Sequence, residues 1–315
     1  MDLSRGRTRR RVRTVVTAAE GSAASRSGAR GSGARGSGLR IAACAKWVDL
    51  RPGVDALTGR VSTDERRFGF SAADAAALEV ALRLGSEWGA EVDVVVAAPA
   101  SAEGAIRSLA AAGASRAIRV DLPSGASSKQ VAASLAAATA DADVVVCGDY
   151  SLDVGSGSVP ASIAHRRGAA QALGLISVTP ESPGVVRVVR RLDGGRREHL
   201  RVRTPAVLSV EGSVATLRRA PLRSLRAGHA PAVEVIDPVG LAVASVRLDR
   251  TEPVRPRARA LPGPNGSAAF DRVVELTGAL VARTPPRRVD AADDADAAAD
   301  AIIEQLAAWG YLDPS

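Results

Sequence analysis

The residue types that could bind a ligand gather in one segment, G-D-Y-S-L-D-V-G-S-G-S-V-P at residues 148–160. It follows the apolar run D-V-V-V-C at residues 143–147, which predicts a buried strand. Two glycines in the segment would let a ligand approach the backbone, and two serines would offer hydroxyls to a phosphate. These residues and the valines that flank them are Val154, Gly155, Ser156, Gly157, Ser158 and Val159. The pattern favours a phosphate site; an ordinary capping loop stays open as the alternative, because G-x-G is a weak signal and no Walker lysine follows.

No arrangement of side chains in the sequence predicts catalysis or a metal centre. His165, His199 and His229 are scattered, and none stands at metal-ligand spacing from a cysteine or a carboxylate. Ser151, Asp153 and His165 could be imagined as a hydrolase triad, but the G-x-S-x-G turn that exposes such a serine is missing. From the residues themselves we therefore expect neither catalytic residues nor a metal.

The two cysteines also give no redox motif. Cys44 and Cys147 are far apart in the sequence and form no C-x-x-C pair. Each falls in an apolar run that predicts a strand, so buried, reduced thiols are favoured over a disulfide. This usage is typical of a cytoplasmic protein.

Stepwise alternation of strand and helix patterns indicates how these residues are positioned. Such alternation implies right-handed βαβ units and a parallel sheet with helices on both faces. We therefore expect a Rossmann-like α/β domain over residues 39–236. Its predicted strands are residues 40–46, 91–97, 117–121 and 143–147, and its predicted helices are residues 73–88, 101–112, 127–138 and 159–170.

After residue 236 the alternation stops. The stretch up to residue 288 is rich in proline, arginine and glycine and contains one helical pattern at residues 270–281. A final helix is predicted at about residues 297–309, because acidic residues before it suit the positive end of a helix dipole. We expect residues 237–315 to form a C-terminal arm and helix, which wraps another surface or stays mobile.

The net charge of +8 comes from the start of the chain. Ten arginines and two acidic residues lie within the first 40 positions, so basic and acidic side chains balance in the rest. Residues 1–38 are also of low complexity, which predicts a disordered tail. A nucleic-acid-binding arm and a transit peptide stay open as alternatives for the tail. For the folded domain we expect no nucleic-acid partner, and no apolar run reaches the roughly 18 residues of a membrane span.

The most specific pattern is a β-hairpin with an unusual set of neighbours. Residues 186–190 and 199–203 flank an Asp-Gly-Gly turn and predict two antiparallel strands, followed by a short buried strand at residues 206–210. The defined positions are Arg190, Asp193, Gly194, Gly195, Glu198, Leu200, Pro205 and Ser209. This combination resembles the signature of the electron transfer flavoprotein β subunit.

The resemblance extends over roughly residues 39–312. Residues 44–49 (C-A-K-W-V-D) resemble the opening strand and turn of that family, and residues 109–118 match its L-A-M-G-A-D-R-A-I segment. The resemblance implies an adenine nucleotide α-hydrolase-like form of the Rossmann-like fold. It also implies an α subunit as partner, which carries the redox-active FAD. Electrons would pass through that flavin from a flavin-dependent dehydrogenase to an electron acceptor oxidoreductase.

In the family the β subunit itself holds a buried AMP. Carried over to this sequence, the resemblance places the AMP beside Cys44, Ser71 and Ala97, with its phosphate held by residues 154–159. Several positions depart from the family's pattern, since its asparagine is Ser71 here and its acidic run has become Val154-Gly155. These departures put AMP in question, and some relatives hold a second FAD instead. Leu50 stands where many members have an aromatic residue that leans on the flavin.

A second candidate interaction site lies in the basic segment L-R-R-A-P-L-R-S-L-R-A-G at residues 217–228. From the residues alone, Leu222 and Leu225 could form an anchor for a partner protein or tuck under a surface loop. The resemblance makes Leu222 the leucine by which the family grips partner dehydrogenases. The divergence of this chain resembles the actinobacterial branch associated with mycofactocin. As a different class of function, a nucleotide-binding regulatory module of the same fold without redox activity stays open.

Overall fold

The computed structural model describes residues 12–14, 38–226, 230–240, 249–250, 252–253, 263–278 and 294–311. The chain divides into two units, Met1–Val254 and Arg255–Ser315, and each is considered by itself. The second unit contains helices α6 (Ala269–Thr277) and α7 (Ala295–Ala308), close to the two helices predicted there. None of the helices within the described residues is long and apolar enough to span a bilayer.

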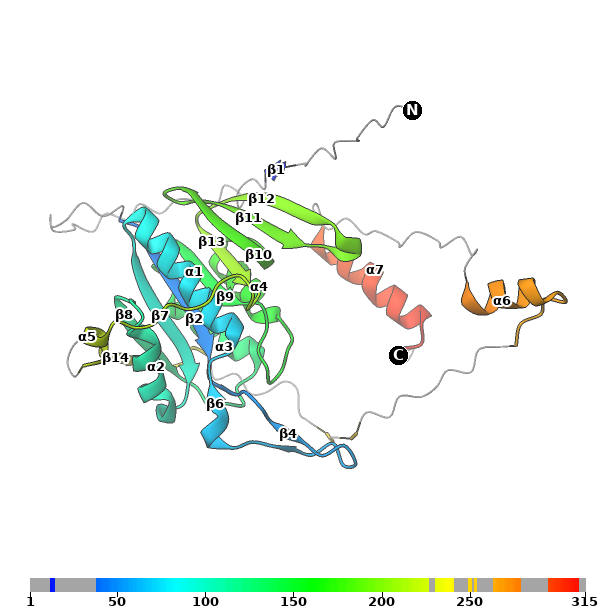
Figure 1. Ribbon diagram of the computed structural model, residues 1–315, viewed down its shortest axis with the longest axis horizontal. Helices are drawn as coiled ribbons and strands as arrows, with labels where there is room; N and C mark the ends of the chain where they lie inside the picture. Colours follow the sequence, from blue (N-terminus) through cyan, green and yellow to red (C-terminus); the bar gives the residue numbers. More distant parts are fainter. Residues whose placement is uncertain are drawn as a thin grey trace. The chain divides into compact units, whose positions relative to one another are not determined.

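The first unit is built on a sheet whose described strands run in the order β1-β12-β11-β10-β13-β9-β2-β7-β8-β14 (Figure 1). From β10 through β13 to β14 all neighbours are parallel, whereas β10, β11 and β12 form an antiparallel ribbon. The Rossmann-like α/β fold is confirmed, with the correction that the sheet is mixed. The strands are β1 (Val12–Thr14), β2 (Arg40–Lys46), β7 (Glu91–Ala98), β8 (Arg116–Asp121), β9 (Val144–Gly148), β10 (Ala170–Ser182), β11 (Val185–Arg191), β12 (Arg197–Arg203), β13 (Ala206–Val210) and β14 (Val233–Ile236).

Helices cover both faces of the sheet because successive strand residues point to opposite sides. In β2, Ile41 and Ala43 pack in the apolar cluster of α1 and α2, whereas Ala42 and Cys44 pack in that of α3 and α4. The near-continuous apolar runs of the strands are therefore buried on both sides, as a parallel sheet requires. The helices are α1 (Ala72–Trp88), α2 (Glu103–Ala110), α3 (Ser128–Ala138) and α4 (Ser158–Arg167).

Strand β10 was not predicted. It begins parallel to β13, with Ala170 opposite Ala206, and continues antiparallel to β11, with Val178 opposite Val188. Gly174, with a φ of 64°, lies where the register with β13 shifts. Glycine and proline inside a run argue against a strand, and this run contains Gly174 as well as a proline. The bulge lets one strand join the antiparallel ribbon to the parallel sheet.

The polar stretch after β2 forms a small extension of its own. Asp49 fixes its base, since the buried carboxylate accepts hydrogen bonds from the backbone N–H groups of Arg51 at 2.8 Å and Asp64 at 3.0 Å. Trp47 packs against Phe70, with ring centroids 5.3 Å apart. The extension comprises the antiparallel pairs β3 (Val48–Asp49) with β6 (Phe68–Gly69) and β4 (Gly53–Val54) with β5 (Val61–Ser62), and the 3₁₀ turn Glu65–Arg67.

Within residues 1–37 the structure describes Val12–Thr14, which form β1 parallel to β12. The prediction of a disordered tail otherwise falls on residues that lie outside those described. The same holds for much of the predicted arm between residues 241 and 293. These two predictions stay predictions.

Candidate functional site

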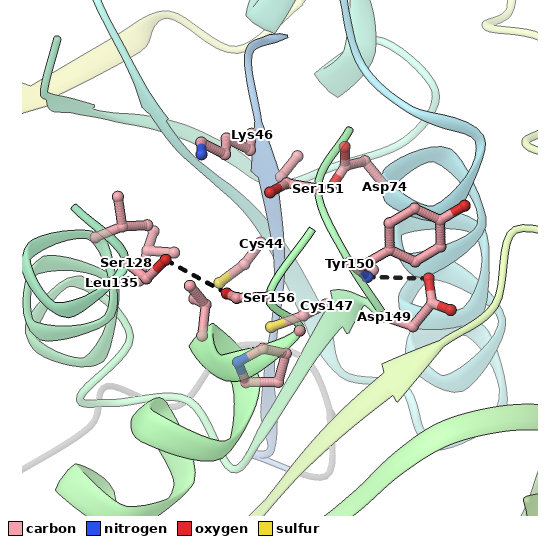
Figure 2. A pocket seen from close by; sticks show the side chains of 16 residues that line it. Cys44, Lys46, Asp74, Ser128, Leu135, Cys147, Asp149, Tyr150, Ser151 and Ser156 are labelled. Carbon is pink, nitrogen blue, oxygen red and sulfur yellow. Dashed lines mark hydrogen bonds between the residues drawn. The ribbon is translucent and has the colours of Figure 1, made fainter. Parts of the chain in front are cut away.

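A cavity of about 60 Å³ lies at the carboxyl ends of β2 and β9 (Figure 2). These neighbouring strands mark the point where the chain order of the sheet reverses, because β7 follows β2 on one side and β9 joins it on the other. Open α/β sheets bind ligands outside such a switch point. The described lining residues are Cys44, Ala45, Lys46, Asp74, Ser128, Val131, Leu135, Cys147, Gly148, Asp149, Tyr150, Ser151, Ser156, Gly157, Val159 and Pro160.

The floor of the cavity carries the two cysteines. Cys44 and Cys147 are directly opposite each other on β2 and β9, and both are buried, free thiols, as predicted. A hydrogen bond with Cys44 and burial raise the pKa of Cys147 well above its usual range. The Cys147 thiol is therefore neutral and gives the floor an apolar character.

One wall is formed by the start of α1. Ser71 and Asp74 make a capping box, in which the Ser71 N–H donates to Asp74 Oδ2 at 3.1 Å and the Asp74 N–H donates to Ser71 Oγ at 3.1 Å. Burial raises the pKa of Asp74 to about 6, although hydrogen bonds from Ser71 and the positive charge of Lys46 oppose the shift. The wall thus contains a carboxyl group that changes charge near neutral pH.

A second wall is the loop that follows β9. Gly157 has a φ of 61° and precedes α4, and a Cβ there would lie 3.1 Å from the carbonyl oxygen of Asp149. The position therefore requires glycine. The hydroxyls of Ser156 and Ser158 lie 2.9 Å apart, and that of Ser156 lies 3.5 Å from the hydroxyl of Ser128, at the start of α3 (Figure 2). Hydroxyls from three elements thus meet beside the cavity.

Lys46, at the end of β2, pairs with the same loop. Its Nζ lies 2.5 Å from Oδ2 of Asp153, and both side chains are less than one-third exposed. Burial raises the pKa of Asp153, but hydrogen bonds from Lys46, Ser151 and the Val154 N–H outweigh it and leave the pKa below its usual value. Asp153 is therefore ionised at neutral pH and neutralises Lys46.

The structure brings together part of the predicted nucleotide site. Cys44, Ser156, Gly157 and Val159 line the cavity. The other five predicted residues do not line it: Val154, Gly155 and Ser158 are exposed neighbours in the loop and α4, Ser71 caps α1, and Ala97 is buried on β7.

Several lining residues were not predicted, because they come from different elements. Lys46 ends a strand, Asp74 belongs to a cap and Ser128 starts a helix, so only the strand order brings them together. The rule that ligands meet the carboxyl ends of parallel strands indicated the segment 148–160, which contains Asp149, Tyr150 and Ser151, but these three residues were not assigned to the nucleotide. The same rule could have indicated Lys46.

The cavity favours a polar ligand and limits its size. Ligand pockets usually occupy roughly 300–1,000 Å³, so a whole nucleotide would need the loop after β9 to move outward. The lining includes one cation and the carboxyl groups of Asp74 and Asp149. The hydroxyls suit a phosphate, whereas the carboxylates oppose it. The residues therefore fit an adenine nucleotide only with a rearranged loop.

No group of three or more His, Cys, Asp or Glu side chains among the described residues could hold a metal. His165 lies on α4 and His199 on β12, while His229 lies outside the described residues. The described lining of the cavity contains no histidine.

The predicted docking residues lie elsewhere in the first unit. Leu222 begins the one-turn helix α5 (Leu222–Leu225) and is 78% exposed, while the side chain of Leu225 lies outside the described residues. The segment before α5 is anchored by Glu79 of α1, which accepts hydrogen bonds from Arg218 Nε at 2.9 Å and Nη2 at 3.1 Å. The exposed Leu222 thus follows, four positions along the chain, an arginine that an ion pair holds on α1.

A mixed, mostly parallel sheet with helices on both faces and a cavity at its switch point defines the class of Rossmann-like α/β domains. Residues 58–273 match the model of the electron transfer flavoprotein domain, and the chain belongs to this family. It is also similar to the electron transfer flavoprotein subunit beta of Chromohalobacter salexigens, with 29% identity over 220 residues, which is 69% of this chain and 77% of that protein. The predicted family is confirmed, while the mycofactocin branch stays a prediction.

Proposed function

We propose that this chain is the β subunit of a heterodimeric electron transfer flavoprotein in the cytoplasm. With an α subunit it would carry electrons from a flavin-dependent dehydrogenase to an electron acceptor oxidoreductase. The observation that carries the proposal is the family match, which begins at residue 58, after β2, covers the rest of the α/β domain and reaches into α6 of the second unit. The chain would then be an electron carrier subunit and not an enzyme.

The helices of the second unit support a partner protein. No residue of α6 is buried, and Phe270, Val273 and Leu276, spaced three apart, are each more than half exposed. In α7, Ile302 and Ile303 are also more than half exposed. Apolar faces of this kind mark protein–protein contacts, because leaving them in water is unfavourable. The α subunit is the partner that we propose for them.

In the proposed role, the residues of this chain bind and position the cofactors and the partner proteins. FAD, held mostly by the α subunit, supplies the electron-carrying chemistry. Leu50, which is 39% exposed at the end of β3, would border the flavin in place of an aromatic side chain. Leu222 would contact the dehydrogenase. The cavity between β2 and β9 would hold an adenine nucleotide, AMP or a second FAD.

Co-expression with the FAD-bearing subunit tests the proposal. The purified complex is expected to be yellow, to contain equal amounts of the two chains and to release FAD, which mass spectrometry identifies. AMP with one FAD per complex would indicate the ordinary carrier, and two FAD would indicate a relative with a second flavin. A complex without flavin would contradict the proposed function.

A nucleotide-binding regulatory module is the second candidate, and the cavity at the switch point favours it. This alternative needs neither a flavin nor an α subunit. It predicts a colourless protein that associates with itself and binds AMP. The flavin absorbance of the purified complex therefore separates the two candidates.

A further inference from the structure

Lys46 is the basic residue among those described around the cavity, and it is already paired. Its side chain is 19% exposed, and its Nζ contacts Asp153, 107 positions further along the chain. The ion pair ties the loop after β9 to the end of β2 beside the cavity. A ligand that needs the positive charge of Lys46 therefore meets a closed pair.

The carboxylate of Asp153 is held in place from three sides. Besides Lys46, it accepts the Val154 N–H at 2.8 Å and a hydrogen bond from the Ser151 hydroxyl. Ser151 itself lines the cavity. Lys46 contacts Oδ2 of this carboxylate and the Val154 N–H donates to Oδ1, so the anionic group receives an ammonium, a hydroxyl and an amide, as a phosphate group would.

The other charged groups of the cavity lining show why the Lys46–Asp153 ion pair matters for the binding of a phosphate. Asp74 and Asp149 are carboxylic acids that line the cavity, so a phosphate would meet negative charge there as long as Lys46 stays neutralised. The hydroxyls of Ser128 and Ser156 can donate to a phosphate but cannot offset those charges. Among the lining residues that the structure describes, Lys46 is the one cation, so a phosphate gains a counter-charge from them by replacing Asp153.

We propose that Asp153 is an internal competitor: its carboxylate occupies on Lys46 the place that the phosphate of an adenine nucleotide takes. The loop after β9 releases Lys46 when the nucleotide binds, and this movement also widens the small cavity. One anion replaces another on the same ammonium group, so the pair sets how tightly the site holds its ligand. The inference rests on the nucleotide-binding part of the proposed function.

Equilibrium binding to the full chain tests the competition, with AMP and FAD as phosphate-bearing probes and adenosine as the probe without phosphate. Asp153→Asn keeps the shape and removes the charge, so we expect it to bind one or both phosphate-bearing probes about fivefold more tightly than the wild type. Lys46→Met should lose this binding. Adenosine affinity should be equal in all three proteins. Whether AMP or FAD shows the gain tells which nucleotide supplies the phosphate.

Asp149→Asn is the matched control, because it removes a charge from the lining without touching Lys46. An equal gain in Asp149→Asn would show that net charge sets the affinity and would overturn the proposal, as would unchanged AMP and FAD affinity in Asp153→Asn. Circular dichroism of each variant confirms that it is folded. If the complex is yellow but Asp153→Asn leaves nucleotide affinity unchanged, the proposed competition by Asp153 is wrong and the electron carrier function stands. If the protein is colourless but Asp153→Asn gains affinity, the competition stands and the electron carrier function is wrong.

Discussion

The two ends of the sheet differ in how their charges are used. At the amino end, Arg40 of β2 lies 2.9 Å from Asp93, 3.1 Å from Glu91 and 3.2 Å from Asp141. The backbone N–H of Arg40 also donates to the carboxylate of Asp143 at 2.8 Å. These contacts join the starts of β2, β7 and β9, so the charged groups at this end pair with one another and hold neighbouring strands together.

At the carboxyl end, the same strands β2 and β9 finish in a cavity. Its polar groups are hydroxyls and carboxyls on loops and helix starts, and Lys46 pairs with a loop residue, Asp153. Loops of this kind can rearrange at low cost compared with paired strands. One end therefore stabilises the sheet, and the other leaves polar groups that a ligand can use.

The largest expected loss of stability follows from a substitution at Asp93, at the amino end of the sheet. The Asp93 side chain is 8% exposed and contacts Arg40 and Arg116, so Asp93→Ala leaves two partly buried guanidinium groups without their shared partner. We expect a loss of about 4 kcal/mol in the free energy of unfolding, measured with urea. AMP affinity should stay unchanged in the folded protein. A loss below about 1 kcal/mol would show that the amino end is not the stabilising end.

Most long strands and helices of the domain could be predicted because their apolar spacing is strong and the glycine stops are clear, whereas the short edge strand β14 was missed. Strand β10 could not, since Gly174 signals a break in the sequence while the sheet tolerates it as a bulge. In the site, the glycine–serine loop could be predicted from composition. Lys46 and Ser128 could not, because the strand order, which the sequence does not display, brings them to one cavity.

The next effect concerns the buried carboxyl group of Asp74 at the carboxyl end. Its pKa is raised from 3.8 to about 6, so the folded state keeps a proton that the unfolded state releases. The stability that this group contributes is present below pH 4 and is lost as the pH rises through about 6. In Asp74→Asn this loss is absent. We expect the variant to exceed the wild type by about 3 kcal/mol at pH 7.5 and by much less at pH 4.5.

Urea unfolding of both proteins at the two pH values checks this expectation. Other carboxylates titrate in the wild type and in the variant alike, so the difference between them isolates position 74. An equal difference at both pH values would mean that Asp74 is ionised throughout, and that the cavity wall is more polar than its burial indicates.

A substitution at Glu79 tests whether the segment before α5, which leads to Leu222, is rigid or can rearrange. The buried Glu79 carboxylate accepts the backbone N–H of Arg218 at 3.1 Å in addition to the guanidinium group. Glu79→Ala should cost about 2 kcal/mol and speed hydrogen exchange at the Arg218 amide, because a partly buried charge loses its partner. Arg83→Ala is the control, since Arg83 is 55% exposed and contacts Glu79 from the other side. Equal effects of both variants would mean that α1 is destabilised as a whole.

The smallest expected change in stability is at Asp153, and this substitution compares the two ends of β2 most directly. Asp93 and Asp153 are both carboxylates paired with a basic residue of β2, one at each end of the strand. The Asp153 side chain is 31% exposed and lies on a loop, so its charge can be solvated when the pair opens. We therefore expect Asp153→Asn to change the free energy of unfolding by less than about 0.5 kcal/mol, measured with urea beside Asp93→Ala. A loss as large as that of Asp93→Ala would show that the loop is part of the stabilising framework, and the two ends of β2 would then no longer differ in kind.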